Sequence, residues 1–329
     1  MSSPVERRRF LCAAVLLLAT GASWSARGGS PARIGWLKIQ GPKASPDQLQ
    51  AFRAGMRALG LIEGRDYILE ERYANGKGTL LPGLAAELVS SGVSLILATS
   101  QPSIAAAAGV TKVVPVIGRM NDDPVANGMA QSLAHPGGNV TGVYALAEEL
   151  NPKRLSLLKE VAPSLHRVGV LLRFDWSNAK HDWQVLEKAG RELGLELVAL
   201  NAHSEEDLVA AFEEASAKRV DGMMTFRNPT VVTYLKLVVE LCTKYRLPAV
   251  FDAGEYVAAG GLVSYGPNID AIYRQLAVYA SKLLHGAQPR ELPIEEPTTF
   301  DLVLNKRAAA RMHIALKPGL LARADRVIE

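Results

Sequence analysis

A unit that occurs twice constrains the fold of this chain more than any other feature. Residues 33–37, RIGWL, are echoed 134 residues later by residues 167–171, RVGVL, and ALGL at 58–61 is echoed by ELGL at 192–195. Each unit has room for a buried strand, a loop, a four-turn helix and a glycine cap. The sequence therefore predicts two α/β lobes of similar build. Proteins of this kind bind small ligands at the carboxyl ends of their parallel strands, in a cleft between lobes.

The amino terminus has the layout of an export signal. Arginines at 7–9 precede the apolar run 11–19, and small residues follow through Ser25. The run is too short to cross the bilayer hydrocarbon, which takes about 20 residues. We therefore expect a signal peptide at residues 1–25, a mature chain in the periplasm and no stable membrane insertion of that chain. Residues 7–11, RRRFL, fit a twin-arginine signal and an ordinary basic region of the Sec route equally well.

Charge and cysteine usage narrow the class of protein. Loss of the signal removes three arginines and one glutamate, which leaves 34 basic and 32 acidic residues. The mature chain has no run of Lys and Arg interleaved with aromatic residues, so we expect no nucleic-acid partner. One cysteine, Cys242, remains after cleavage, and a single thiol forms no internal disulfide. Its apolar neighbours at helical spacing predict that it is buried.

Strand and helix patterns alternate along the chain, as in doubly wound parallel sheets. The strands expected in the first half are 33–37, 67–73, 95–99, 115–118 and 140–143, and those in the second half are 167–172, 195–200, 222–226, 248–251 and 262–265. A helix at 269–284, an extended stretch at 288–299 and a strand at 300–304 follow. Such a tail is typical of a chain that crosses between lobes several times, which makes a bending hinge.

The crossing pattern gives a division into domains. We assign residues 33–142 and 267–287 to an N-terminal lobe, and residues 143–266 and 288–329 to a C-terminal lobe. The predicted fold class is therefore α/β, with two doubly wound parallel-sheet lobes joined by a multi-crossing hinge.

Polar residues follow two strands of the first lobe. Thr99, Ser100 and Gln101 end one strand and open a helix, so hydroxyls and free N–H groups converge on a spot suited to a carboxylate. A helix cap without a ligand explains the same residues equally well. Asp123 follows the next strand and could pair with a ligand ammonium. Alternatively, Asp122 or Asp123 caps a helix after the following proline.

The candidate residues for an apolar ligand body come from both lobes. Tyr144 ends a strand of the first lobe, and Trp176 lies in the loop after the first strand of the second lobe. Trp176 could stack on a ligand or pack as a lip residue against the other lobe. Phe226 and Asn228 follow the strand at 222–226, and Asp252 follows the strand at 248–251. We include all of them as candidate ligand-binding residues.

Catalytic and metal-binding motifs are missing from the sequence. There is no G-x-S-x-G elbow, no G-x-x-x-x-G-K-[ST] phosphate loop and no G-x-G-x-x-G after the first strand. The six histidines show no H-x-x-x-H or Cys/His spacing. We therefore expect no metal site, no cofactor and no enzymatic activity. An exported α/β hydrolase or reductase is the alternative from another class, and a repressor effector domain would require a helix-turn-helix that the sequence lacks.

Several stretches, in this order, resemble one known family. They are 51–60 (AFRAGMRALG), 84–89 (LAAELV), 132–142 (SLAHPGGNVTG), 153–155 (KRL) with 157–160 (LLKE), 259–267 (AGGLVSYGP) and 321–325 (LARAD). The chain resembles the bacterial ABC-transporter substrate-binding proteins of the TrpX-like family, whose fold is similar to that of type I periplasmic binding proteins.

The resemblance implies a function. Such a protein binds a small organic solute between its lobes and delivers it to an ABC permease in the inner membrane, and an amino acid, aromatic above all, is the implied solute. The dipeptide at Asp123 and Pro124 resembles a motif at the cleft of the family. Many relatives carry Asp where this chain has Asn228, so the ligand preference of the family does not transfer directly.

Overall fold

Parallel strands buried between two layers of helices build the first half of the chain. The computed structural model describes residues 30–44, 46–145, 149–175, 179–226 and 228–329. Within them the first sheet has five parallel strands in the order β2-β1-β3-β4-β5. They are β1 (Ala32–Lys38), β2 (Tyr67–Tyr73), β3 (Leu95–Ala98), β4 (Val116–Met120) and β5 (Val140–Tyr144). Strands β3, β4 and β5 are buried throughout, as expected for a parallel sheet covered on both faces.

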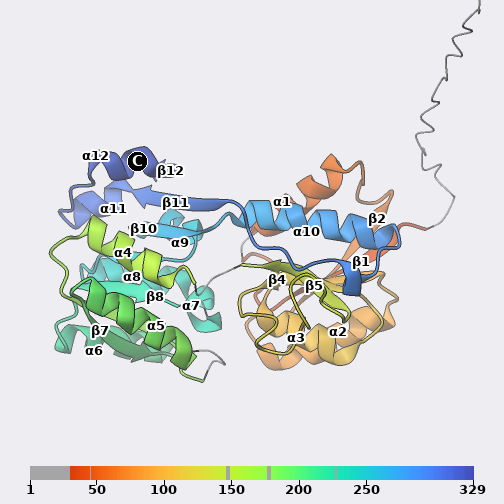
Figure 1. Cartoon of the computed structure of the whole chain (residues 1–329), viewed down its shortest axis with the longest axis horizontal. Helices are drawn as coiled ribbons and strands as arrows, with labels where there is room; N and C mark the ends of the chain where they lie inside the picture. The colour runs from red at the N-terminus through yellow and green to blue at the C-terminus, as the bar shows by residue number, and fades with distance from the viewer. Residues whose placement is uncertain (1–29, 45, 146–148, 176–178, 227) are drawn as a thin grey trace, which may run out of the picture. The chain divides into compact units, whose positions relative to one another are not determined.

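Two pairs of helices cover this sheet. One face packs against α1 (Pro46–Ala58) and α10 (Ile269–Leu284), which lie side by side although they are far apart in the sequence (Figure 1). The other face packs against α2 (Leu81–Ser90) and α3 (Gln101–Val110). A short 3-10 turn, η1 (Gly78–Leu80), precedes α2, and a second, η2 (Pro289–Glu291), follows α10.

The second sheet, as far as the described residues show, has the order β12-β11-β10-β9-β8-β6-β7. Its strands are β6 (Arg167–Leu172), β7 (Glu196–Asn201), β8 (Gly222–Thr225), β9 (Ala249–Phe251), β10 (Val263–Pro267), β11 (Phe300–Asn305) and β12 (Arg326–Ile328). Strand β11 is antiparallel to β10, whereas the other neighbouring pairs are parallel. The second sheet is thus a parallel sheet with a mixed edge.

Helices also cover both faces of the second sheet. One core includes residues of α4 (Asn151–Val161), α5 (Ala179–Glu192), α11 (Lys306–Arg311) and α12 (Pro318–Arg323). The other core includes residues of α6 (Glu205–Ala217), α7 (Pro229–Thr233), α8 (Leu235–Lys244) and α9 (Gly254–Ala258). The predicted α/β class with two doubly wound lobes is confirmed.

The repeated sequence unit corresponds to β1-α1 in the first lobe and β6-α5 in the second. Both helices end at a glycine with positive φ, +79° at Gly60 and +66° at Gly194. The following N–H groups close the helices in the same way: Leu61 donates to Met56 O at 3.0 Å, and Leu195 donates to Gly190 O at 2.8 Å. The two copies therefore share their helix caps as well as their order of elements.

Several local expectations are confirmed. Strands β2 and β6 and helix α10 have the bounds that the sequence predicted. The structure also has a capping box at the start of α6, in which Asp207 N donates to Ser204 Oγ at 3.1 Å. Cys242 is buried, and burial raises the pKa of its thiol. Strand β12 and the antiparallel direction of β11 were not anticipated. The described helices include none that is long and apolar enough to cross a membrane.

The chain passes between the sheets after β5, after β10 and before β11. Strand β5 continues to Tyr144, two residues past the boundary inferred from the sequence, and Tyr144 N donates to Glu295 O at 2.9 Å. Asn268 joins two of the crossings: its N–H donates to Thr299 O at 2.9 Å, and its Nδ2 donates to Asp301 Oδ2 at 2.9 Å. Its Oδ1 also accepts from Ala271 N and caps α10.

The contact between β4 and β5 predicts a large effect of one glycine. Gly142 has φ +140°, and a Cβ there would overlap the carbonyl oxygen of Gly118 and lie 2.8 Å from its nitrogen. We expect Gly142→Ala to lower the free energy of unfolding by at least about 3 kcal/mol, because strain and overlap add. Gly64→Ala is the control, since φ is +86° in open space, and should cost about 1–2 kcal/mol. Equal losses in urea unfolding would contradict this account.

Candidate ligand-binding site

Three polar side chains lie in one row at the carboxyl edge of the first sheet. The strand register pairs Leu37 with Ala98 and Ala98 with Gly118, so the next residues, Lys38, Thr99 and Arg119, are neighbours across β1, β3 and β4. Thr99 N donates to Leu37 O at 3.1 Å and continues the ladder. Each of the three residues is only 4% exposed.

The row lies on the face of the sheet that α1 and α10 cover. Side chains two residues earlier on the three strands, Trp36, Leu97 and Ile117, belong to the core beneath these helices. The Lys38 Nζ donates a hydrogen bond to the carbonyl of Ala44, in the loop that leads into α1. The polar row therefore ends this apolar core at the edge where α1 begins.

The charge of Lys38 depends on its surroundings. Burial lowers the pKa of its ammonium to about 8. The Glu255 carboxylate opposes this shift, the Arg119 guanidinium adds to it, and Glu71 opposes it. Lys38 and Arg119 were not among the candidate residues predicted from the sequence, because the segments IGWLK and VIGRM are mostly apolar and indicate buried strands. The sequence signal for both residues is a cationic side chain at or near the end of an apolar strand segment.

Two side-chain oxygens at this edge, one at the start of α3 and one after β4, accept no hydrogen bond from the protein. Ser100 occupies the N-cap position, but its side chain makes no cap hydrogen bond, and its Oγ lies 2.9 Å from Ser103 Oγ. Gln101 is buried, and its Oε1 accepts no hydrogen bond; the same holds for Asn121 Oδ1 at the end of β4. A buried acceptor without a donor is costly, so both oxygens favour a ligand that carries N–H groups.

Asp123 has a structural role in its own loop. Its Oδ1 accepts from Val125 N at 2.8 Å and from Ala126 N at 3.2 Å, within a turn rather than a helix. This turn does not use the second oxygen, Oδ2. Tyr144 is buried at the end of β5, and its hydroxyl donates to Glu149 Oε1. Both residues lie at the carboxyl edge of the first sheet, as the sequence predicted.

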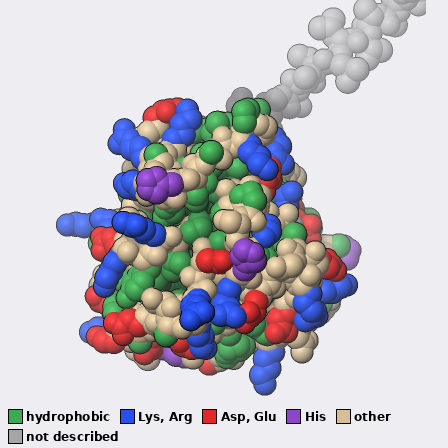
Figure 2. All heavy atoms as spheres, turned by 90° about the vertical axis from the view of Figure 1, so that its left-hand side faces the viewer, with side chains coloured by type: hydrophobic (Ala, Val, Ile, Leu, Met, Phe, Trp, Pro, Cys, Tyr) green, Lys and Arg blue, Asp and Glu red, His purple; other side chains and the backbone are tan. Residues whose placement is uncertain are grey.

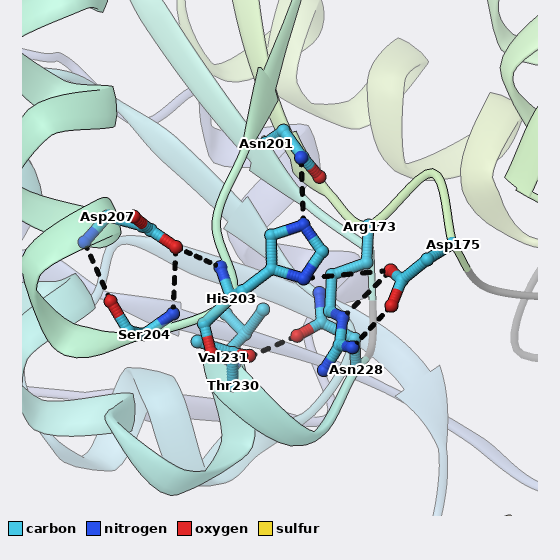
Figure 3. Close-up of polar contacts among 9 residues, drawn as sticks. All are labelled: Arg173, Asp175, Asn201, His203, Ser204, Asp207, Asn228, Thr230 and Val231. Carbon is cyan, nitrogen blue, oxygen red and sulfur yellow. Dashed lines mark hydrogen bonds and ion pairs between the residues drawn. The ribbon is translucent and has the colours of Figure 1, made fainter.

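A polar cluster lies at the corresponding edge of the second sheet (Figure 3). Arg173 follows β6 and holds Asp175 with two hydrogen bonds, of 3.1 Å from Nε and 2.6 Å from Nη2. These bonds lower the pKa of the Asp175 carboxyl. His203 Nδ1 lies 3.8 Å from Asp175 Oδ1, and its Nε2 lies 2.9 Å from Asn201 Nδ2. The cluster holds Asp175, which directly precedes Trp176 in the sequence. Trp176 itself lies outside the described residues.

The other candidate residues of the second lobe mostly pack or form hydrogen bonds within that lobe. Phe226 is buried in the lobe core. Asn228 caps α7: its Oδ1 accepts from Val231 N at 3.1 Å, and its Nδ2 donates to Phe226 O at 3.1 Å. Asp252 is buried directly after β9, where a Cβ on Gly266 would overlap its carbonyl oxygen. The structure thus places these residues at the carboxyl edge of the second sheet.

Comparison with known proteins identifies relatives. The model of a family described as "ABC transporter substrate binding protein" matches residues 40–328. A tyrosine-binding protein of Clostridioides difficile (strain R20291) is 23% identical over 258 residues, which are 78% of this chain and 74% of that protein.

Solved structures share the fold over nearly the whole chain. A conserved domain protein from Vibrio cholerae O1 biovar El Tor is 25% identical, with a TM-score of 0.81 over 91% of this chain and 100% of its own. An ABC domain in complex with L-Trp from Streptococcus pneumonia is 23% identical, with a TM-score of 0.82 over 91% of this chain and 100% of its own. These likenesses agree with two α/β lobes.

Proposed function

Since the chain belongs to the family of ABC transporter substrate-binding proteins, we propose that it is the periplasmic receptor of an import system and that its solute is an aromatic amino acid. Relatives named for tyrosine binding and solved with L-Trp support the choice of solute. The receptor closes around the solute and presents it to a permease in the inner membrane. In this proposal the protein releases the solute to the permease in the chemical form in which it was bound.

The observation that carries this proposal is the set of polar groups at the carboxyl edge of the first sheet. Thr99, Ser100 and the free N–H groups at the start of α3 suit a carboxylate. Gln101 Oε1 and Asn121 Oδ1 are acceptors without donors, and an amino acid brings an ammonium group. A zwitterion therefore supplies both kinds of partner that this edge lacks.

Residues of the second lobe complete the proposed site. Trp176 or Phe226, together with Tyr144 of the first lobe, would contact the aromatic body of the solute, and Asn228 and Asp252 would lie at its rim. Contacts from both lobes are required, because a ligand shifts a conformational equilibrium only by binding one state better than the other.

The charge distribution does not favour a nucleic-acid partner. Figure 2 shows acidic and basic side chains interspersed over the face that it presents, in keeping with 37 basic and 33 acidic residues in the sequence. A binder of nucleic acid would show clustered Lys and Arg on such a face. The proposed partners are a small molecule and a permease.

A thermal-shift screen tests the proposed solute. We expect L-tyrosine or L-tryptophan to raise the melting temperature by several degrees, because a ligand at 100 times its Kd adds about 2.7 kcal/mol. Purines and small carboxylates, which lack an ammonium group, serve as controls in the same plate. Stabilisation by these controls and by no amino acid would contradict the proposal.

The signal pattern predicts where the mature protein is found. We expect the native protein to begin near Ala26 and to be released with the periplasmic fraction. Intact mass measurement of the protein purified from its own cells checks the first residue. Fractionation of the same cells checks the location. A cytoplasmic protein that retains residues 1–27 would refute export.

Asp123 provides a test of the ammonium partner. In Asp123→Asn the Oδ1 acceptor of the turn is kept, so the melting temperature should stay nearly unchanged. The charge on Oδ2 is lost, and calorimetric titration with the amino acid found in the screen should show binding weaker by roughly 1.5–3 kcal/mol. An unchanged affinity would remove Asp123 from the site and leave it a role in the turn alone.

A further inference from the structure

Two side-chain amides lie at matching positions on the carboxyl edge of the first sheet. The strand register pairs Ala98 of β3 with Gly118 of β4, and Gln101 and Asn121 each follow three residues later. Ser100 keeps an extended backbone, with φ −155° and ψ 160°, so the chain continues in the direction of β3 before α3 begins. The two strands lie about 4.8 Å apart, and the two amides extend from neighbouring positions of the edge.

Neither amide oxygen has a donor within the described part of the protein. Gln101 is 7% exposed, and its Oε1 is buried and accepts no hydrogen bond. The same holds for Asn121 Oδ1. An amide donates as well as accepts, yet neither of these two amides donates to the oxygen of the other. The edge therefore presents two neutral acceptors that are left for a donor of another molecule.

The same chain satisfies comparable amides elsewhere. Three asparagines cap helices with their amide oxygens: Asn228, Asn268 and Asn305. Gln48 is also 7% exposed, and its Oε1 accepts from the Tyr273 hydroxyl at 3.1 Å. Among the described residues, the buried amide oxygens without a donor are those of Gln101 and Asn121. Both belong to the edge at which the solute is proposed to bind.

The number of donors on the α-carbon of a solute decides how many of the two acceptors it satisfies. A primary ammonium has three N–H donors, a hydroxyl has one, and an oxo group has none. Each acceptor that stays buried without a donor costs about 10- to 100-fold in affinity. An ammonium is therefore the group that suits this pair best.

We propose that Gln101 and Asn121 together bind the ammonium group of the solute and make the receptor specific for amino acids over the hydroxy acids and oxo acids of the same carbon skeleton. This inference rests on the proposed function and adds to it the residues that set the class of solute.

The assignment has a consequence for stability. In the unliganded protein both oxygens are buried without a donor, which lowers the stability of the fold. An apolar side chain of similar size at either position removes this cost. Variants that lose affinity for the solute should therefore be more stable than the wild type when no solute is present.

Calorimetric titration of the purified protein with three probes tests the selectivity. L-tyrosine, L-3-(4-hydroxyphenyl)lactate and 4-hydroxyphenylpyruvate share one skeleton and carry an ammonium, a hydroxyl and an oxo group on the α-carbon. We expect the wild type to bind L-tyrosine about 10- to 100-fold more tightly than the hydroxy acid, and the oxo acid more weakly still. L-tryptophan, indole-3-lactate and indole-3-pyruvate form a second series.

Two variants test the residues. Gln101→Met and Asn121→Leu each replace one acceptor by an apolar group of similar size. Each should bind L-tyrosine about 10- to 100-fold more weakly and the oxo acid at least as tightly, so the preference shrinks. The melting temperature of each unliganded variant should rise by about 1–4 °C, because one unsatisfied acceptor is gone.

The matched control is Gln48→Met, at a glutamine of equal burial whose oxygen has a donor. It should lower the melting temperature, because the Tyr273 hydroxyl loses this acceptor, and it should keep the preference for L-tyrosine. Three results overturn the inference and leave the proposed function standing: equal binding of L-tyrosine and the oxo acid by the wild type, an unchanged preference in both variants, or a lowered melting temperature in both. A wild type that binds neither L-tyrosine nor L-tryptophan overturns the proposed function, and the inference with it.

Discussion

The burial of both faces of each parallel sheet is the constraint on which the rest of the structure depends. Strands such as β3 to β5 contribute apolar side chains to two helical layers at once, so most of their interior positions hold apolar residues. Polar side chains enter where the strands end. The carboxyl edge is the place where helix N-termini also meet, and backbone donors and charged side chains gather there for the same topological reason.

This edge combines groups that the protein satisfies with groups that it does not. Both polar atoms of the Asn228 amide are hydrogen-bonded, Oδ1 as the cap of α7 and Nδ2 to Phe226 O, and one Asp123 oxygen is used in its own turn. By contrast, Gln101 Oε1 and Asn121 Oδ1 accept no hydrogen bond. Protein interiors rarely tolerate such groups without a purpose, because each costs free energy of folding. The two unsatisfied acceptors are therefore the basis for proposing a ligand at this edge.

The fold could be predicted well from the sequence, because the spacing of apolar residues indicates which faces of the strands and helices are buried. The paired RIGWL and RVGVL segments, the glycine caps at Gly60 and Gly194 and the strands β2 and β6 followed from local signals alone. Strand β12 did not, since RVI is short and it pairs with residues of β11 that lie 23 positions earlier in the chain. Thr99, Asp123 and Asn228 were placed at strand ends correctly. Their hydrogen-bond partners and the row that joins Lys38 to Arg119 depend on strand order, which periodicity does not encode.

The bonds of Asn268 have a mechanical meaning. Two backbone segments that are hydrogen-bonded side by side bend together readily, and they resist twisting about their long axis. The crossing after β10 and the crossing before β11 are fastened in this manner through Thr299 and Asp301. For the proposed closure of the two lobes, these bonds favour bending over twisting.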